Sequence, residues 1–518
     1  MKVTVLWVDD EIEFLRPHII FLEQKGYTIL TSNNGRDSLD IVKSNDLDLV
    51  FLDENMPGLS GLETLSLIKE IKPALPIVMI TKSEEENIMD QAIGSKISDY
   101  LIKPVSPKQV LLSIKKNVHN RQLITDKTSA DYRAEFGKIT QFIGSAKTFS
   151  DWVEILRKLV MWNMELADLN DPSLAQILEY QKNEANGEFA KFIKNNYLSW
   201  FVSETSEKPL ISPNLFRNKV FPAIDSGQKV LFILIDNFRF DQWKAIEPII
   251  STLWRVENES IYCGILPTAT QYARNAIFSG LMPLEIQKHY PDLWVFDEED
   301  EGKNLNEEEL LNKQIQRLGK NYKWYYEKSN TFKPGHKIVD NLKEILKKDL
   351  TVLVYNFVDI LSHSRTEMEM MKELASDEAA YLSLTKSWFL HSDLWALIKE
   401  AANQKVKLIL TTDHGTVRVQ NAIKVIGDKA TSSNLRYKLG KNLNYNPKEV
   451  FEIRKPEDAH LPKPNVSSSF IFAYNTDFLA YPNNYNHYVK YFKNTFQHGG
   501  ISLEEMLIPF IELKPIEG

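Results

Sequence analysis

Short apolar runs alternate with longer stretches of helical periodicity along the first part of the chain. The runs Val3–Val8 and Leu49–Leu52 have the length and composition of buried strands. Amphipathic stretches such as Phe14–Lys25 and Leu62–Ile71 follow them. This alternation predicts a doubly wound parallel sheet over residues 1–120, a fold whose ligands bind outside the carboxyl ends of the strands.

The pattern changes twice in the rest of the chain. Residues 121–206 show helical periodicity without a clear strand, which predicts a helical module. Strand-like runs return in residues 207–518 at Val230–Ile235, Leu350–Phe357 and Lys407–Thr412, with long insertions between them. We therefore expect a second α/β domain over 207–518 and an α/β multidomain protein overall.

Composition and charge narrow the class of protein. With 43% apolar residues, 25% charged residues and a net charge of −8, the chain is typical of globular proteins and atypical of proteins that grip duplex DNA through its phosphates. No helix-turn-helix follows the first domain, so direct reading of operator DNA is not expected. The single Cys263 excludes an intramolecular disulfide and fits a reducing compartment. No segment reaches the about 18 consecutive apolar residues of a membrane span, so the expected location is the cytoplasm.

Polar side chains follow the predicted strands of the first domain. Asp9 and Asp10 follow the first strand, and Asp53 ends the third. Three carboxylates at one edge of a sheet suit Mg²⁺, which prefers oxygen ligands. One of them can attack a phosphoryl donor, while the Lys103 ammonium and the Thr81 hydroxyl hold the new phosphate.

This arrangement resembles the response-regulator receiver family over essentially all of the first domain. The resemblance implies phosphorylation of Asp53 by a sensor histidine kinase. It assigns the other members of the set as follows: Mg²⁺ ligation by Asp9, Asp10 and the Asn55 carbonyl, phosphate sensing by Thr81 and Lys103, and an aromatic reorientation by Tyr100. An inactive receiver that serves only for docking is the alternative.

Carboxylate, imidazole and hydroxyl side chains in the second half of the chain form another candidate group, most of them placed where a strand-like run ends. They are Asp236, Thr270, Asp359, His363, Asp413, His414 and His498. Thr270 begins a predicted helix, whose N-terminus favours an anion. Mixed imidazole and carboxylate ligation suits Zn²⁺, with Mn²⁺ as a rival. Two such ions and a hydroxyl nucleophile are what a phosphoryl-transfer centre needs.

This group resembles the alkaline phosphatase superfamily and, within it, the PglZ domain, to whose entry motif the run Ile235–Asp241 is similar. The resemblance implies two Zn²⁺ ions with two ligand sets: Asp236, Thr270, Asp413 and His414 for one, and Asp359, His363 and His498 for the other. It selects Thr270 over Thr268 as the nucleophile, because the superfamily uses the second threonine of Pro-Thr-x-Thr.

The helix that follows the nucleophile supplies further candidates. The backbone N–H of Gln271 would be an oxyanion donor. Arg274 and Asn275 could contact the phosphoryl group, or could be ordinary surface residues of the helix. Beyond Arg274 the sequence offers no assured cation for a phosphomonoester dianion, which favours phosphodiester substrates. A sulfatase or phosphomutase is disfavoured because no Cys-x-Pro-x-Arg motif surrounds Cys263.

The order of the three parts resembles response regulators that control type IX secretion. This resemblance implies phosphorylation-dependent homodimerisation, contact with an extracytoplasmic-function sigma factor, and phosphodiesterase action on nucleotides or short oligonucleotides. The leading hypothesis is a phosphorylation-controlled zinc phosphodiesterase, and the alternative is a non-catalytic metal-binding adaptor. The basic stretch 428–464 is interpreted either as a lid over an anionic substrate or as a surface insertion.

Overall fold

The structure is a computed structural model of the 518-residue chain. It describes residues 3–82, 97–167, 169, 171–202, 208–296, 304–329, 341–356, 358, 377–428, 431–482 and 485–516. Contacts between residues divide the chain into two compact units, Met1–Ala134 and Glu135–Gly518. The helical module is thus part of the same unit as the second α/β domain, while the finer division at 120 and 206 remains a prediction. Among the described helices, none is both long and apolar enough to cross a membrane.

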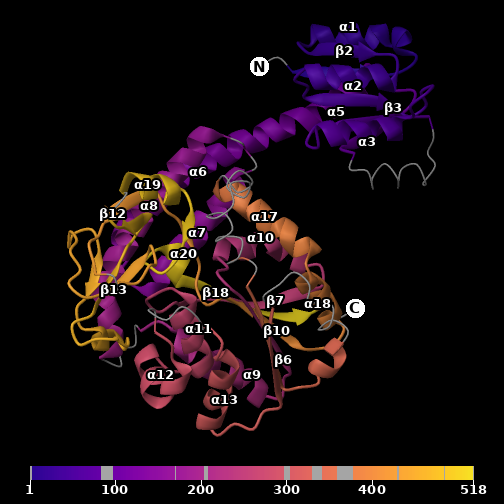
Figure 1. Ribbon diagram of the computed structural model, residues 1–518. Helices are drawn as coiled ribbons and strands as arrows, with labels where there is room; N and C mark the ends of the chain where they lie inside the picture. The colour runs from indigo at the N-terminus through magenta and orange to yellow at the C-terminus, as the bar shows by residue number, and fades with distance from the viewer. Residues whose placement is uncertain are drawn as a thin grey trace. The chain divides into compact units, whose positions relative to one another are not determined.

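The first unit contains a five-stranded parallel sheet in the order β2-β1-β3-β4-β5, which confirms the doubly wound fold (Figure 1). Its strands are β1 (Thr4–Val8), β2 (Thr28–Ser32), β3 (Leu49–Asp53), β4 (Ile77–Thr81) and β5 (Asp99–Ile102). Its helical segments include η1 (Ile12–Leu15), α1 (Arg16–Gln24), α2 (Gly35–Ser44), α3 (Gly61–Ile71) and α5 (Pro107–Ile114).

Alternate side chains of β1 belong to two different hydrophobic cores. Val5 and Trp7 pack with residues of α1 and α5, whereas Leu6 and Val8 pack with residues of α2 and α3. A strand buried on both faces reads as a continuous apolar run, as Val3–Val8 does. The two core layers therefore hold β1 and β3 at the centre of the sheet, where their last residues share one edge.

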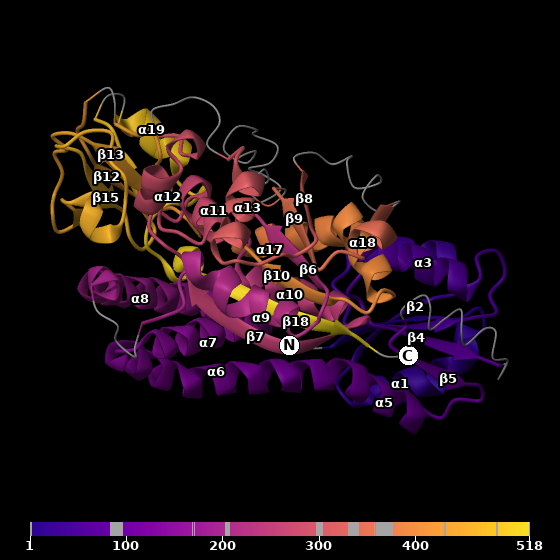
Figure 2. The ribbon, with the colours of Figure 1, turned by 90° about the horizontal axis from the view of Figure 1, so that it is seen from below.

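The second unit begins with long helices. They are α6 (Asn120–Ser145), which also extends into the first unit, α7 (Phe149–Ala167) and α8 (Pro172–Asn196), followed by η3 (Tyr197–Phe201). The helix α8 runs unbroken because buried Gln181, Ala185 and Phe189 continue the spacing of one apolar face. In Figure 2, α7 and α8 run beside β7 and β18, and Arg157 of α7 donates a hydrogen bond to the Glu259 carbonyl at 2.8 Å.

A six-stranded mixed sheet in the order β7-β18-β10-β6-β9-β8 forms the centre of the second unit. Its strands are β6 (Val230–Ile235), β7 (Trp254–Cys263), β8 (Trp324–Ser329), β9 (Leu350–Tyr355), β10 (Lys407–Thr411) and β18 (Leu507–Pro515). Helices cover both faces, as Figure 1 shows, and they include α9 (Phe221–Asp225), α10 (Phe240–Ile250), α11 (Thr270–Ser279), α12 (Pro283–His289), α13 (Glu307–Arg317), α17 (Glu378–His391) and α18 (Asp393–Ala402). Strands β6, β9 and β10 are parallel neighbours, so their carboxyl ends meet at one edge.

A smaller module is inserted between β10 and β18. It contains the pairs β11 (Val417–Arg418) with β17 (Phe496–Gln497) and β12 (Asn421–Lys424) with β16 (Asp477–Ala480), the three-stranded sheet of β13 (Tyr437–Gly440), β15 (Ser469–Phe472) and β14 (Phe451–Ile453), and α19 (Tyr485–Phe492). The short helix α20 (Leu503–Met506) leads into β18. The interpretation of 428–464 as a lid or surface insertion is wrong in part, because Arg436 and Lys438 are buried within this folded module.

Candidate metal centre

Three metal-ligating side chains meet at the carboxyl ends of β6 and β10. Ligand atoms of Asp236, Asp413 and His414 all lie within 4.8 Å of one another, and all three residues are buried. The chain turns sharply after Asp236, where Asn237 adopts a left-handed φ of 62°, a conformation that asparagine tolerates better than most residues. The Phe238 N–H then donates to the Thr412 hydroxyl at 3.0 Å, which joins the two strand ends.

The two threonines of the Pro-Thr-x-Thr motif have different surroundings. The Thr270 Oγ1 lies 3.0 Å from Nε2 of His414 and 3.5 Å from Oδ1 of Asp236. The Thr268 Oγ1 instead donates to the Gly500 carbonyl at 2.8 Å and accepts from the Gly499 N–H at 3.1 Å. The Thr268 hydroxyl therefore binds the backbone of the Gly499–Gly500 loop. The hydroxyl of Thr270, at the start of α11, instead faces the candidate ligands.

The imidazoles of His414 and His498 are stacked, with ring centroids 4.3 Å apart and an angle of 18° between the rings. In each ring Nδ1 faces a backbone carbonyl, that of Gly415 at 3.2 Å for His414 and that of Thr268 at 3.2 Å for His498. When Nδ1 donates to a carbonyl, Nε2 carries the lone pair that can bind a metal. This tautomer suits both residues as ligands through Nε2.

Arg274 is fully buried and faces carboxylates. Its Nε donates to Oδ2 of Asp413 at 2.8 Å, a second ion pair joins it to Asp236, and a third joins it to Glu307 at 3.3 Å. Burial by itself would raise the pKa of Asp413, but the charges of Arg274 and His414 and the hydrogen bond from Arg274 together outweigh burial and lower that pKa. The structure thus places Arg274 beside the candidate ligand carboxylates, and its contact with a phosphoryl group stays a prediction.

The other predicted residues of α11 lie in its first turns. The backbone N–H of Gln271 belongs to the group of helix N-terminal donors without an intrahelical acceptor, and its side-chain amide donates to the Val295 carbonyl. Asn275 is 2% exposed, so it is not the surface residue that the alternative reading expected. Asp359 and His363, the remaining predicted ligands of the second ion, lie outside the described residues.

The donor set fits a zinc ion. Two carboxylates, one imidazole nitrogen and a hydroxyl converge from three segments, and such nitrogen and oxygen donors are common around tetrahedral Zn²⁺. The imidazole of His498, which is stacked on that of His414, lies next to these donors. The residues that sequence reasoning missed are the carboxylate of Glu307 and the amide of Asn356, which accepts from Arg274 Nη1 at 3.1 Å. No sequence spacing relates Glu307 or Asn356 to the Pro-Thr-x-Thr motif, because only tertiary packing brings them next to Arg274.

The receiver residues gather at the carboxyl edge of the first sheet. Ligand atoms of Asp9, Asp10 and Asp53 lie within 4.8 Å of one another. The Lys103 ammonium lies 2.9 Å from Asp9 and 3.0 Å from Asp53. Burial raises the pKa of Asp53. Burial would lower the pKa of Lys103, but hydrogen bonds to Asp9 and Asp53 outweigh it and raise that pKa.

The remaining predicted receiver residues lie at or near strand ends of the same sheet. Thr81 is the last residue of β4 and is 4% exposed. Asn55 is exposed just after β3, and Tyr100 is 39% exposed on β5. The described part of the receiver therefore brings together Asp9, Asp10, Asp53 and Lys103, while the roles of Asn55, Thr81 and Tyr100 stay predictions.

Comparison with protein-family models matches three consecutive stretches of the chain. Residues 5–115 match the response regulator receiver domain, residues 122–201 the PorX response regulator linker domain, and residues 215–513 the BREX system PglZ alkaline phosphatase-like domain.

Curated relatives match a smaller part of the chain. The transcriptional regulatory protein ResD of Bacillus subtilis (strain 168) is 37% identical over 114 residues, which cover 22% of this chain and 47% of ResD. The transcriptional regulatory protein ZraR of Escherichia coli O157:H7 is 29% identical over 138 residues, covering 27% of this chain and 31% of ZraR. The chain therefore spans less than half of the length of either relative.

Among solved structures, the chemotaxis protein CheY4 of Vibrio cholerae is similar with a TM-score of 0.22 and 24% identity, covering 23% of this chain and 99% of that chain. A response regulator receiver domain protein from Clostridium thermocellum has a TM-score of 0.22 and 28% identity, covering 23% and 98%. The PglZ match spans more than half of the 518 residues. This chain therefore belongs to the family of PglZ alkaline phosphatase-like domains, which it joins to a response regulator receiver domain and a PorX-type linker domain.

Proposed function

We propose that the PglZ domain is a zinc-dependent phosphodiesterase with Thr270 as its nucleophile, and that the receiver domain controls it. The observation that carries this proposal is the position of the Thr270 hydroxyl, 3.0 Å from His414 Nε2 and 3.5 Å from Asp236 Oδ1, at the N-terminus of α11. A bound zinc ion would lower the pKa of this hydroxyl and polarise the phosphoryl oxygen.

The reaction is a double displacement in which the Thr270 side chain is transiently esterified. The hydroxyl proton leaves to solvent, Oγ1 forms a bond to phosphorus, and the bond from phosphorus to the leaving oxygen breaks. Water then attacks phosphorus, the bond to Oγ1 breaks, and the threonine hydroxyl is restored. The Gln271 N–H and the dipole of α11 stabilise the negative charge that develops on the phosphoryl oxygens.

The pairing of Arg274 supports a preference for diesters. A phosphomonoester dianion carries one more negative charge than a diester and needs a further cation in the site. Arg274 is the cation of α11 that the sequence offers for this task, and its guanidinium is already paired with Asp236, Asp413 and Glu307. Nucleotides or short oligonucleotides are the substrates that we propose.

The receiver domain supplies the input. A sensor histidine kinase transfers a phosphoryl group to Asp53, whose carboxylate lies beside Asp9, Asp10 and Lys103 with Mg²⁺ as cofactor. We further propose that phosphorylation favours a homodimer and that the protein acts in the cytoplasm in the control of type IX secretion, in contact with an extracytoplasmic-function sigma factor. These partners rest on the match to the receiver and PorX-type linker domains.

The test is turnover of the zinc-loaded protein on a chromogenic phosphodiester and on short oligonucleotides, beside Thr270→Ala. We expect hydrolysis by the wild type and none above background by the variant, with zinc content unchanged. The same pair is assayed after treatment with an acyl phosphate, with Asp53→Ala as the control for the receiver. Equal turnover by Thr270→Ala would refute the nucleophile, and no turnover by any zinc-loaded sample would favour the adaptor.

A further inference from the structure

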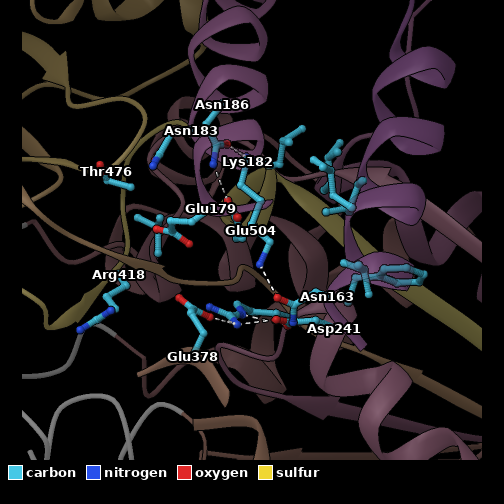
Figure 3. A pocket seen from close by; sticks show the side chains of 18 residues that line it. Asn163, Glu179, Lys182, Asn183, Asn186, Asp241, Glu378, Arg418, Thr476 and Glu504 are labelled. Carbon is cyan, nitrogen blue, oxygen red and sulfur yellow. Dashed lines mark hydrogen bonds and ion pairs between the residues drawn. The ribbon is translucent and has the colours of Figure 1, made fainter. Parts of the chain in front are cut away.

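A polar seam lies between the helical module and the catalytic domain. It surrounds a cavity of about 40 Å³ that α7 and α8 line on one side and α10, α17 and α20 on the other (Figure 3). On the first side Lys182 of α8 donates to Asn163 of α7 at 2.7 Å, and on the second Arg239 pairs with Asp241 of α10 and Glu378 of α17. The seam thus combines these polar pairs with apolar lining residues such as Leu156, Leu159 and Val160 of α7, within one compact unit.

Asn186 of α8 crosses this seam with both ends of its amide. Its Nδ2 donates to Glu504 Oε2 at 3.0 Å, and its Oδ1 accepts from the Leu503 N–H at 2.7 Å. Figure 3 shows the side chains of Asn186 and Glu504 directed toward one another. Asn186 is 2% exposed, so both hydrogen bonds are shielded from water. The contact fixes α20 to α8 at the first two residues of that short helix.

One side of α20 lies against the loop that carries His414. The Gly415 N–H donates to the Glu505 carbonyl at 3.3 Å. A Cβ on Gly415 would overlap the carbonyl oxygen of Glu504, so only glycine permits this approach. The position of the His414 backbone therefore depends on the position of α20.

The loop that carries His498 depends on the same helix through a carboxylate. Glu505 is fully buried, and its Oε1 accepts from the Gly500 N–H at 2.9 Å. Arg436 holds this carboxylate through Nε at 3.1 Å and Nη2 at 2.6 Å. The helix α20 is thus the common support of the two loops whose imidazoles are stacked 4.3 Å apart between ring centroids.

We propose that Asn186 is a positioning residue through which α8 of the linker domain sets the placement of His414 and His498, and with it the affinity of the centre for zinc. The proposal rests on the proposed function, since it takes these two imidazoles as zinc ligands. Partners that orient ligands from outside the ligand shell commonly change metal affinity or activity by about 10- to 100-fold. A displacement of α8 would reach both imidazoles by one route.

The test uses the full-length protein and measures zinc affinity by competition with a chromogenic chelator, together with thermal unfolding of the zinc-free protein. Asn186→Leu keeps the branching and the number of heavy atoms of the side chain, removes both hydrogen bonds and should weaken zinc binding about tenfold. The exchanged pair Asn186→Asp with Glu504→Gln keeps an acceptor for Leu503 and reverses the donor, so it should bind zinc as the wild type does. Asn183→Leu, on the same helix and lining the same cavity, is the matched control and should leave zinc affinity unchanged.

Three outcomes decide the proposal. Weak zinc binding by Asn186→Leu with recovery in the exchanged pair supports it. Wild-type affinity in Asn186→Leu, or equally weak binding in the exchanged pair, overturns it. If Asn186→Leu does not fold, Asn186→Asp alone replaces it, because it sets two carboxyl groups against each other, and adding Glu504→Gln must restore zinc affinity. Zinc affinity is measured without turnover. Failure of the wild type to hydrolyse diesters would therefore refute the proposed function, while the zinc affinities of the variants would still decide the role of Asn186.

Discussion

Arg274→Met should destabilise the zinc-free protein far more than the loss of one surface ion pair. The guanidinium is fully buried and is paired with Asp236, Asp413 and Glu307. Methionine keeps an unbranched apolar stem but removes the guanidinium, which leaves carboxylates of the interior without their cation. Breaking a buried ion pair by removing one partner costs about 3–5 kcal/mol.

This cost can be converted into a change in Tm. At an unfolding entropy of about 2 cal/mol/K per residue, spread over the unit Glu135–Gly518, about 3–5 kcal/mol corresponds to a fall in Tm of about 4–6 °C. Zinc should reduce the difference in Tm between the wild type and Arg274→Met. A cation bound to Asp236 and Asp413 replaces part of the lost charge and stabilises the folded state.

The assay is thermal unfolding by differential scanning calorimetry, with a chelator and with zinc. Arg454→Met is the matched control, since its partner Glu452 holds it at the surface, and it should leave Tm nearly unchanged. An unchanged Tm for zinc-free Arg274→Met would refute the reasoning. A loss of Tm that zinc does not reduce would show that Arg274 acts through packing and not through the charges of the two carboxylates.

Three other substitutions test separate parts of the account. Thr268→Val should lower the free energy of unfolding by about 1–3 kcal/mol in urea titrations, because it removes the hydroxyl that serves two buried backbone groups, and it should spare more turnover than Thr270→Ala; equal loss of turnover in both would contradict this. Gly415→Ala should destabilise by about 1–3 kcal/mol in the same titration, because its Cβ overlaps the Glu504 carbonyl, and an unchanged urea midpoint would count against the contact. Burial lowers the pKa of Lys438 to about 7; since the unfolded chain then binds a proton that the folded chain lacks between pH 7 and 10.5, this group should make stability rise with pH over that window. Lys438→Met should raise stability at pH 7 and flatten that rise, and an unaltered pH profile of urea midpoints would be contrary to a neutral buried lysine.

Much of the fold was predictable because its central strands are buried on both faces. The runs at Val230–Ile235 and Lys407–Thr412 are continuous and apolar, and each ends at an aspartate that the parallel sheet then brings to one edge. The helical module was predicted without the bounds of its helices, because Gln181 and Gly187 interrupt the apolar composition of α8 without interrupting its packed face. Local composition reports hydrophobicity, whereas helix continuity depends on the spacing of the buried positions.

The convergence of three candidate ligands could be predicted, but their supporting contacts could not. Asp236, Asp413 and His414 follow strands, and their convergence follows from sheet geometry. Nothing in the sequence indicates that Arg274 would turn toward carboxylates, because Glu307 lies on another helix and meets it only in the folded core. The same is true of Asn186, which lies 318 residues before its partner Glu504 in the sequence.

The central claim is that Thr270 becomes esterified during turnover. The most direct measurement is peptide mass spectrometry of zinc-loaded protein quenched in acid during hydrolysis of bis(p-nitrophenyl) phosphate. Attack by Oγ1 expels one nitrophenolate, so the account predicts a nitrophenyl phosphoryl group on the peptide that contains Thr270, absent from Thr270→Ala. Hydrolysis without this adduct, or an unchanged rate in Thr270→Ala, would contradict the account.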